Sequence, residues 1–243
     1  MLKRLPILVV LAAACALLGA APLASPVPLK TDMFTYEVQI IPEAEETTSV
    51  VIVSLALPPE TPLPATVRLP IPKGGTIYWS GEILGDDFGG DIGRQFRRVP
   101  GEGGDSAEIT LEETRTAQID ATYKQLDVRG GEYSLVLDWV QTEPCKDVSF
   151  SVRIPGSVTG LTLEPDAPGS PLTNVMGERL YTLAPVALKP GEEFPVKVTY
   201  SRPELARSTS PATIILWVIS GLLIIAVGAL AVVVARQHRG NDA

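Results

Sequence analysis

The sequence predicts an all-β ectodomain of the immunoglobulin-like or fibronectin-like β-sandwich type, with two sandwiches in tandem and one C-terminal transmembrane α-helix. Three observations predict this fold class. Short runs of alternating apolar and polar residues recur from position 34 to position 200. Gly and Pro clusters break these runs about every 8 to 12 residues, which is typical of sandwiches. A long uncharged apolar segment then precedes the C-terminus.

The N-terminal segment, residues 1–24, has the order of a secretory signal peptide. A basic start is followed by an apolar run and then by small residues, and cleavage is expected within residues 21–24. Two alternatives stay open. The segment could remain as an uncleaved anchor, or the run that ends at Cys15 could serve as a lipid-attachment sequence.

Residues 26–125 are expected to form the first sandwich. The run Phe34–Ile41 alternates at period two, and Ser49–Leu57 is almost wholly apolar and β-branched, as is typical of a central strand. The charges of residues 108–127 also fit a helix, but the threonines there and the alternation after Gln118 favour strands. Further strands are expected at 65–69, 76–79, 107–111 and 118–123.

Residues 126–203 are expected to form a second, smaller sandwich, and residues 204–212 a juxtamembrane stalk. The boundary is placed at the Gly-containing stretch Asp127–Gly131. One continuous sandwich of about 170 residues is the alternative. The expected strands are 132–140, 148–154, 161–164, 180–183 and 194–200.

Residues 213–235 are 23 residues without a charged side chain. At about 1.5 Å per residue, such a helix crosses the roughly 30 Å hydrocarbon layer of a membrane. The tail 236–243 begins with an arginine, which predicts a cytoplasmic C-terminus, an outer ectodomain and a single-pass location in the cell membrane. A stripe of small residues predicts pairing with another membrane helix: Gly221, Gly228, Ala231 and Ala235.

The ectodomain, residues 26–212, is acidic. It holds 16 of the chain's 20 Lys and Arg residues and 27 of its 28 Asp and Glu residues, a balance of −11. Such a surface repels phosphate backbones, so nucleic acid does not suit it as a partner. Cys145 is the single cysteine after the signal segment, which excludes an internal disulfide. We expect a buried, inert thiol, with pairing to another chain as the alternative.

Catalysis that depends on histidine is excluded from the ectodomain, because the only histidine is His238 in the tail. Ser-His-Asp and Cys-His mechanisms both need an imidazole base. Zinc and copper sites with histidine or several cysteines are excluded for the same reason. We therefore expect no catalytic residues, no enzyme activity and no bound cofactor.

The stretch Trp79–Asp91 contains the candidate ligand contacts of the ectodomain. Trp79 ends an expected strand and could stack on a sugar ring, with Glu82 beside it. Two carboxylates held about 5 to 10 Å apart could also hydrolyse a glycoside. Trp139, by contrast, alternates with leucines and is expected in the core. Oxygen ligands for a calcium ion could come from three residues: Asp86, Asp87 and Asp91.

These features together favour a non-catalytic, membrane-tethered binding or scaffold protein of the cell envelope. It would bind a protein or an envelope polymer, or serve as an accessory subunit of a membrane complex. The absence of any Asn-x-Ser/Thr sequence fits a bacterial source. Two alternatives come from other classes: a surface carbohydrate-binding module or hydrolase that uses the Trp79–Asp91 loop, and a calcium-stabilised adhesion protein.

Overall fold

The computed structural model describes residues 28–45, 47–85 and 90–202. Within these ranges it contains only strands, and no helix is long and apolar enough to span a membrane. The strands are β1 (Thr35–Glu45), β2 (Thr48–Ala56), β3 (Ala65–Pro70), β4 (Thr76–Glu82), β5 (Ile92–Gly93), β6 (Arg97–Gly101), β7 (Gly104–Leu111), β8 (Thr116–Gln125), β9 (Asp127–Arg129), β10 (Glu132–Val140), β11 (Asp147–Ile154), β12 (Thr159–Glu164), β13 (Leu172–Thr173), β14 (Arg179–Thr182) and β15 (Glu193–Ser201).

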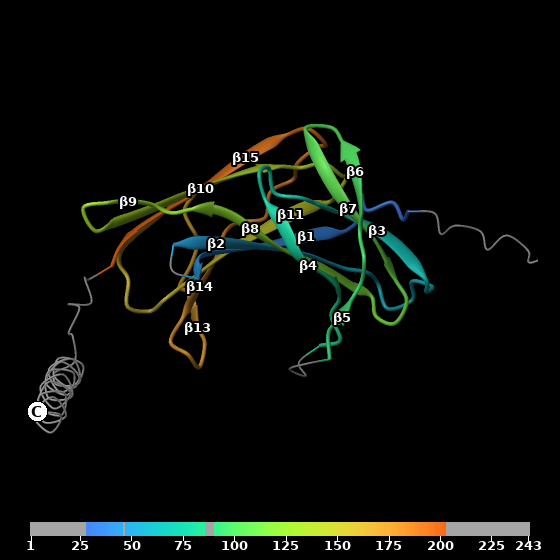
Figure 1. Ribbon diagram of the computed structural model, residues 1–243, viewed down its shortest axis with the longest axis horizontal. Helices are drawn as coiled ribbons and strands as arrows, with labels where there is room; N and C mark the ends of the chain where they lie inside the picture. The colour runs from blue at the N-terminus through green and yellow to red at the C-terminus, as the bar shows by residue number, and fades with distance from the viewer. Residues whose placement is uncertain (1–27, 46, 86–89, 203–243) are drawn as a thin grey trace, which may run out of the picture.

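An eight-stranded sheet is the centre of the fold, with the strand order β13-β14-β11-β1-β2-β8-β4-β5. Figure 1 shows it as a curved layer whose two ends, at β13 and β5, both lie low in the view. β1 pairs in parallel with β11, while its other neighbour, β2, is antiparallel. A parallel neighbour needs a long crossover, and here the chain places nine further strands between the two partners.

Two smaller sheets cover one face of this central sheet. One has the order β12-β15-β10-β9 and the other the order β3-β7-β6, and both lie above the central strands in Figure 1. Alternate residues of β1, β2, β8 and β11 point towards them and are buried, and they join the inner residues of β3, β7, β10 and β15 in one hydrophobic cluster. Burial of this shared core is the main stabilising term of such a sandwich.

The largest buried side chains connect the layers. The Trp139 ring lies edge-on to Phe150, with ring centroids 5.8 Å apart, and its indole N–H donates to Gln141 Oε1 at 3.2 Å. This confirms the prediction that Trp139 belongs to the core. Tyr36 of β1 is fully buried and donates its hydroxyl hydrogen to the Arg68 carbonyl of β3 at 2.8 Å. Burial raises the pKa of Tyr36, although the hydrogen bond with Thr31 opposes this shift.

The prediction of an all-β, sandwich-like ectodomain is confirmed for the described ranges. The expected domain boundary at residues 125 and 126 needs correction, because it does not separate the sheets. β11 and β14 lie beyond it in sequence, yet they extend the sheet formed by β1 and β2. The physical reason is the parallel β1–β11 pairing, which places strands of both halves side by side over a shared core.

Several predicted segments lie outside the described residues. These are the signal peptide 1–24, the stalk 204–212, the transmembrane span 213–235 with its small residues, and the tail 236–243. They stay predictions from the sequence.

Candidate functional site

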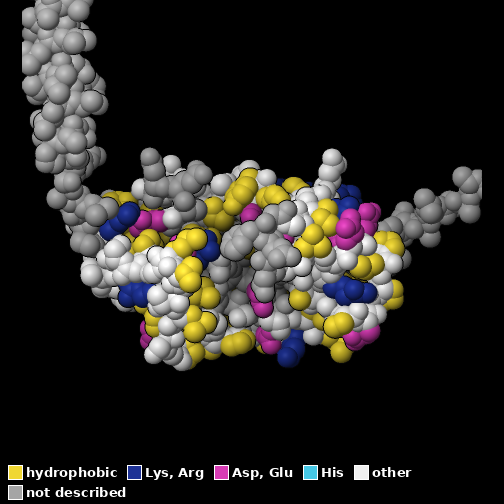
Figure 2. All heavy atoms as spheres, turned by 90° about the horizontal axis from the view of Figure 1, so that it is seen from below, with side chains coloured by type: hydrophobic (Ala, Val, Ile, Leu, Met, Phe, Trp, Pro, Cys, Tyr) yellow, Lys and Arg dark blue, Asp and Glu magenta, His cyan; other side chains and the backbone are white. Residues whose placement is uncertain are grey.

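The candidate site lies on the face of the eight-stranded sheet that the two smaller sheets leave uncovered, which we call the open face. Alternate residues of six adjacent strands point there, and most are polar. The partners that follow one another across the sheet are Thr182, Ser151, Gln39, Ile52, Asp120 and Trp79 in one row, and Ser149, Glu37, Ser54, Gln118 and Gly81 in the next. Figure 2 views the molecule from this side and shows hydrophobic, acidic, basic and uncharged polar side chains there.

Trp79 provides the aromatic surface of this face. It pairs with Asp120 across β4 and β8, after a bulge that leaves Tyr78 as an extra residue between Ile77 and Trp79. The indole lies over Gly81, since a Cβ atom on that glycine would be only 2.9 Å from Trp79 Cζ2. The partly exposed ring therefore forms a flat apolar platform, and Tyr78 beside it is 58% exposed.

Gln118 and Asp120 supply hydrogen-bonding groups next to that platform. The Gln118 side-chain amide donates to Asp120 Oδ1 at 2.8 Å. Among the described residues no Lys or Arg side chain pairs with Asp120. Burial raises the pKa of Asp120, the Gln118 hydrogen bond lowers it, and the negative charge of Asp91 raises it again, so the net direction is upward. A carboxylate without a cation is thus held beside an indole.

Glu82, expected as a ligand contact beside Trp79, lies on the other face and is fully buried. Oε1 accepts hydrogen bonds from Arg94 Nε at 2.6 Å and from the Glu112 backbone N–H at 2.9 Å. Oε2 accepts from the backbone N–H groups of Glu113 at 2.9 Å and Thr114 at 2.5 Å. Burial raises the pKa of Glu82, but these donors outweigh it and the net shift is downward. The expectation of a ligand contact is therefore corrected: the carboxylate anchors the turn between β7 and β8.

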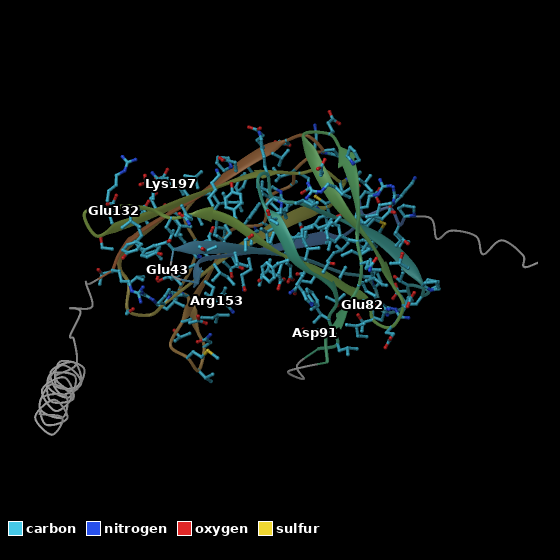
Figure 3. The ribbon with its side chains drawn as sticks, in the orientation of Figure 1. Glu43, Glu82, Asp91, Glu132, Arg153 and Lys197 are labelled. Carbon is cyan, nitrogen blue, oxygen red and sulfur yellow. The ribbon has the colours of Figure 1, made fainter. Side chains whose placement is uncertain are left out.

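The acidic loop after β4 is only partly described. Asp86 and Asp87 lie outside the described residues, whereas Asp91 is exposed and accepts the Leu84 backbone N–H at 3.3 Å. Figure 3 places Glu82 and Asp91 at the same end of the molecule. No cluster of three or more His, Cys, Asp and Glu side chains suited to a metal ion occurs within the part of the chain that the structure describes.

Cys145 is half-buried against the core, and its thiol approaches the Leu188 carbonyl at 3.7 Å. Burial raises the pKa of the Cys145 thiol to about 11, the Leu188 contact lowers it, and the charge of Asp147 raises it further. Because the thiolate is the reactive form, this environment disfavours thiol chemistry at neutral pH.

The residues that sequence reasoning missed are Gln118 and Asp120. Their signal was present as the polar half of the alternation in residues 118–123. Their relation to Trp79 depends on the β4–β8 register, which includes a bulge that no local pattern reveals.

Comparisons with known proteins identify no family: no family model matches the chain, and no curated protein matches it. Among solved structures, native leukotriene A4 hydrolase from Saccharomyces cerevisiae is similar at a TM-score of 0.37 and 9% sequence identity. The match covers 81% of this chain and 33% of that protein, so the chain spans about a third of its length. At this TM-score the likeness carries no inference about fold or activity.

Proposed function

We propose that this chain is a non-catalytic, membrane-tethered binding protein of the cell envelope whose open face receives a protein partner or an envelope polymer. In this proposal the sandwich is of the immunoglobulin-like or fibronectin-like type. The signal segment 1–24 exports it, the span 213–235 anchors it, and the tail 236–243 stays in the cytoplasm. Such a protein could act as an accessory subunit of a membrane complex.

The observation that carries the proposal is that only one of the two faces of the central sheet is covered by other sheets. One face is covered by two smaller sheets, whereas the other presents short polar side chains and Trp79. Ser54, Gln39 and Gln118 can each donate and accept hydrogen bonds. A curved, hydrogen-bonding face with one aromatic platform is suited to binding.

Site-specific crosslinking in native membranes tests the proposal. A photoreactive benzoylphenylalanine at Ser54, in the middle of the open face, is expected to give a discrete crosslinked product of the full-length protein. The same group at Thr199, which lies on β15 in the smaller sheet, serves as the matched control and is expected to give none. Equal products from both positions, or none from Ser54 in any growth condition, would refute binding through this face.

A second candidate function, saccharide binding, is favoured by one specific observation. Trp79 offers a flat ring, and the Gln118 amide and Asp120 carboxylate lie beside it on the neighbouring strand. The C–H face of a sugar packs on an indole, while its hydroxyl groups donate to a carboxylate and accept from an amide. This set supports a ligand with many hydroxyl groups.

This candidate is tested by isothermal titration calorimetry of the full-length protein with cell-wall polysaccharide fragments. Trp79→Ala is expected to weaken binding at least about tenfold, because a central aromatic contact is lost. Met33→Ala removes an exposed apolar side chain away from the open face and is expected to leave affinity unchanged. If wild type binds no fragment, or if both variants bind alike, the saccharide candidate fails.

The hydrolase hypothesis receives less support from the described residues. A hydrolase needs two free carboxylates, and both Glu82 oxygens are already occupied by backbone N–H groups and Arg94. The calcium hypothesis stays a prediction from the sequence, because Asp86 and Asp87 lie outside the described ranges.

A further inference from the structure

The β13–β14 hairpin carries exposed apolar side chains at its tip. Val175 and Met176 are 103% and 79% exposed, and Leu172 at the base of the hairpin is 71% exposed. These are three of the seven large hydrophobic side chains that are exposed in the described part of the chain. Clustered apolar exposure of this kind marks an interaction surface.

The tip is held in one conformation by its own hydrogen bonds. Asn174 Oδ1 accepts the backbone N–H groups of Met176 at 3.0 Å and Glu178 at 2.9 Å, and its amide donates to Glu178 Oε2 at 2.7 Å. Gly177 adopts a φ of 77°, which suits glycine, and its N–H donates to the Asn174 carbonyl at 3.0 Å. The loop therefore presents Val175 and Met176 to solvent without further ordering.

This hairpin projects from the end of the molecule at which the described chain leaves the fold. β14 begins at Arg179, which pairs with Ile154 at the last position of β11. β11 runs parallel to β1, whose far end carries Glu43. Glu43 in turn binds Arg202, the last described residue, at 2.7 Å. Figure 1 accordingly shows the hairpin and the end of β15 in the same half of the molecule, and Figure 3 shows Glu43 and Arg153 there.

We infer that the tip of the β13–β14 hairpin, Val175 and Met176, contacts the lipid surface of the membrane beside the anchor and orients the ectodomain on it. The inference rests on the proposed anchoring through residues 213–235. Only residues 203–212 separate Arg202 from that segment. Fully extended, these residues span at most about 36 Å, so the exit end stays close to the bilayer.

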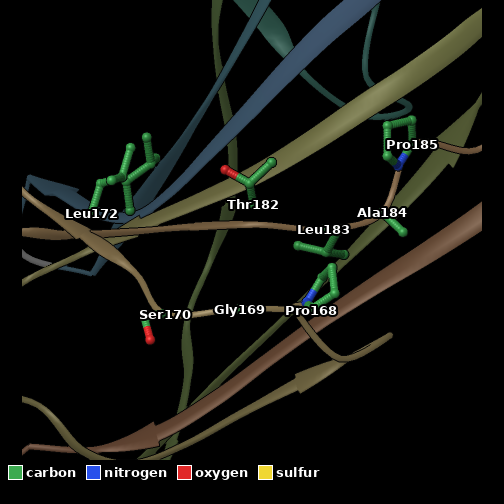
Figure 4. Close-up of a pocket in the computed structure, with 9 residues that line it drawn as sticks. Pro168, Gly169, Ser170, Leu172, Thr182, Leu183, Ala184 and Pro185 are labelled. Atoms are coloured by element: carbon green, nitrogen blue, oxygen red, sulfur yellow. The ribbon is translucent and has the colours of Figure 1, made fainter.

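The chemistry of this end fits a lipid surface despite the acidic ectodomain. Three of the carboxylates at this end occur in ion pairs: Glu43 with Arg202 at 2.7 Å, Asp127 with Arg129 at 2.8 Å, and Glu178 with Arg153 at 3.8 Å. Paired charges reduce repulsion from anionic headgroups. Leu172 and Leu180 extend the apolar surface from the tip into a hollow of about 370 Å³ at the base of the hairpin, also lined by Pro168 and Pro185 (Figure 4).

A polarity-sensitive fluorophore tests the inference in full-length protein reconstituted into phosphatidylcholine–phosphatidylglycerol vesicles. In a Cys145→Ser background, the label is attached at Val175→Cys or, as the control, at Met33→Cys, whose native side chain is 78% exposed. Burial in lipid is expected to shift the emission of the label at position 175 to the blue and to let a lipid-borne quencher reach it. The label at position 33 is expected to keep the emission of a fluorophore in water and to stay unquenched.

A second variant tests the tip itself. With the label at Leu172→Cys, the change V175S/M176S is expected to reduce lipid quenching at least about tenfold, because the two apolar side chains that would insert into the lipid are lost. Both side chains are exposed, so thermal unfolding of this variant is expected to match that of its parent.

The possible outcomes separate the inference from the proposal on which it rests. Retention of the protein in vesicles washed at alkaline pH supports the anchor. Retention with an unshifted label at position 175 overturns only the hairpin contact. A blue shift without lipid quenching assigns the tip to a contact between copies and also overturns it. Release by the alkaline wash overturns both.

Discussion

Trp79 and Glu82 lie three residues apart on β4, and the sheet separates them completely. Successive side chains of a strand point to opposite faces, so an odd spacing sends one outward and the other inward. Trp79 faces the open face beside Asp120, while Glu82 faces the interior and binds the turn 112–114. The sequence pattern predicts that the strand ends at Trp79, whereas β4 continues to Glu82, so the side chain expected as a ligand contact points into the interior.

The buried carboxylate of Glu82 makes a specific prediction about stability. Glu82→Gln replaces a charged acceptor of four hydrogen bonds by an amide whose NH₂ group faces donors. We expect the free energy of unfolding to fall by about 2 to 4 kcal/mol at pH 7. Urea unfolding of the two proteins, followed by circular dichroism, measures the difference. Glu112→Gln is the matched control, because its exposed side chain pairs with the same Arg94, and it is expected to cost less than about 1 kcal/mol.

The same residue sets a pH dependence. The pKa of Glu82 is lower in the folded protein than its ordinary value, so its stabilisation is present above the unfolded-state pKa of about 4.3 and is lost as the pH falls through the folded-state pKa. The difference between wild type and Glu82→Gln should therefore be constant from pH 7 to about pH 5 and shrink in more acidic buffer. A difference that is unchanged at pH 3 would contradict a charged, hydrogen-bonded Glu82.

At the level of strands, the sequence pattern was informative where one face of a strand is buried. β1, β10, β11 and β15 follow the predicted alternation, and the buried sets agree, as with Phe150, Val152 and Ile154 on β11. The preference for strands over a helix within residues 108–127 is also confirmed by β7 and β8. Period-two hydrophobicity records burial, and these strands bury one face in the shared core.

The strands that the pattern missed bury little. β6 (Arg97–Gly101) and β13 (Leu172–Thr173) are exposed along most of their length, and β5 has only two residues. β6 pairs with β7 through charged rather than apolar side chains, and Arg97 of β6 forms an ion pair with Glu108 of β7 at 2.6 Å. Burial raises the pKa of Glu108, but Arg97 and Arg68 lower it and the net shift is downward. Cross-strand ion pairs of this kind leave no hydrophobic period in the sequence.

At the scale of the whole molecule, the decisive contact is the parallel pairing of β1 with β11. Tyr36 pairs with Val148 and Ile40 with Val152, across more than a hundred residues of chain. Local patterns carry no information about such partners, so the sequence could predict the strands and not their order. The candidate site has the same limit, since its residues come together only through the order and register of the strands in the sheet.

This arrangement predicts that neither half of the ectodomain folds alone. Residues 26–125 expressed alone would expose the β1 edge that β11 covers, and residues 126–203 would lack the layer that buries Leu137, Val196 and Val198. We expect residues 26–203 to unfold in one cooperative thermal transition. Each half should show no cooperative transition, and mixing the halves should restore strand signal by circular dichroism. If instead each half melts cooperatively near the temperature of the intact ectodomain, the two predicted sandwiches are independent domains and the shared sheet contributes little to stability.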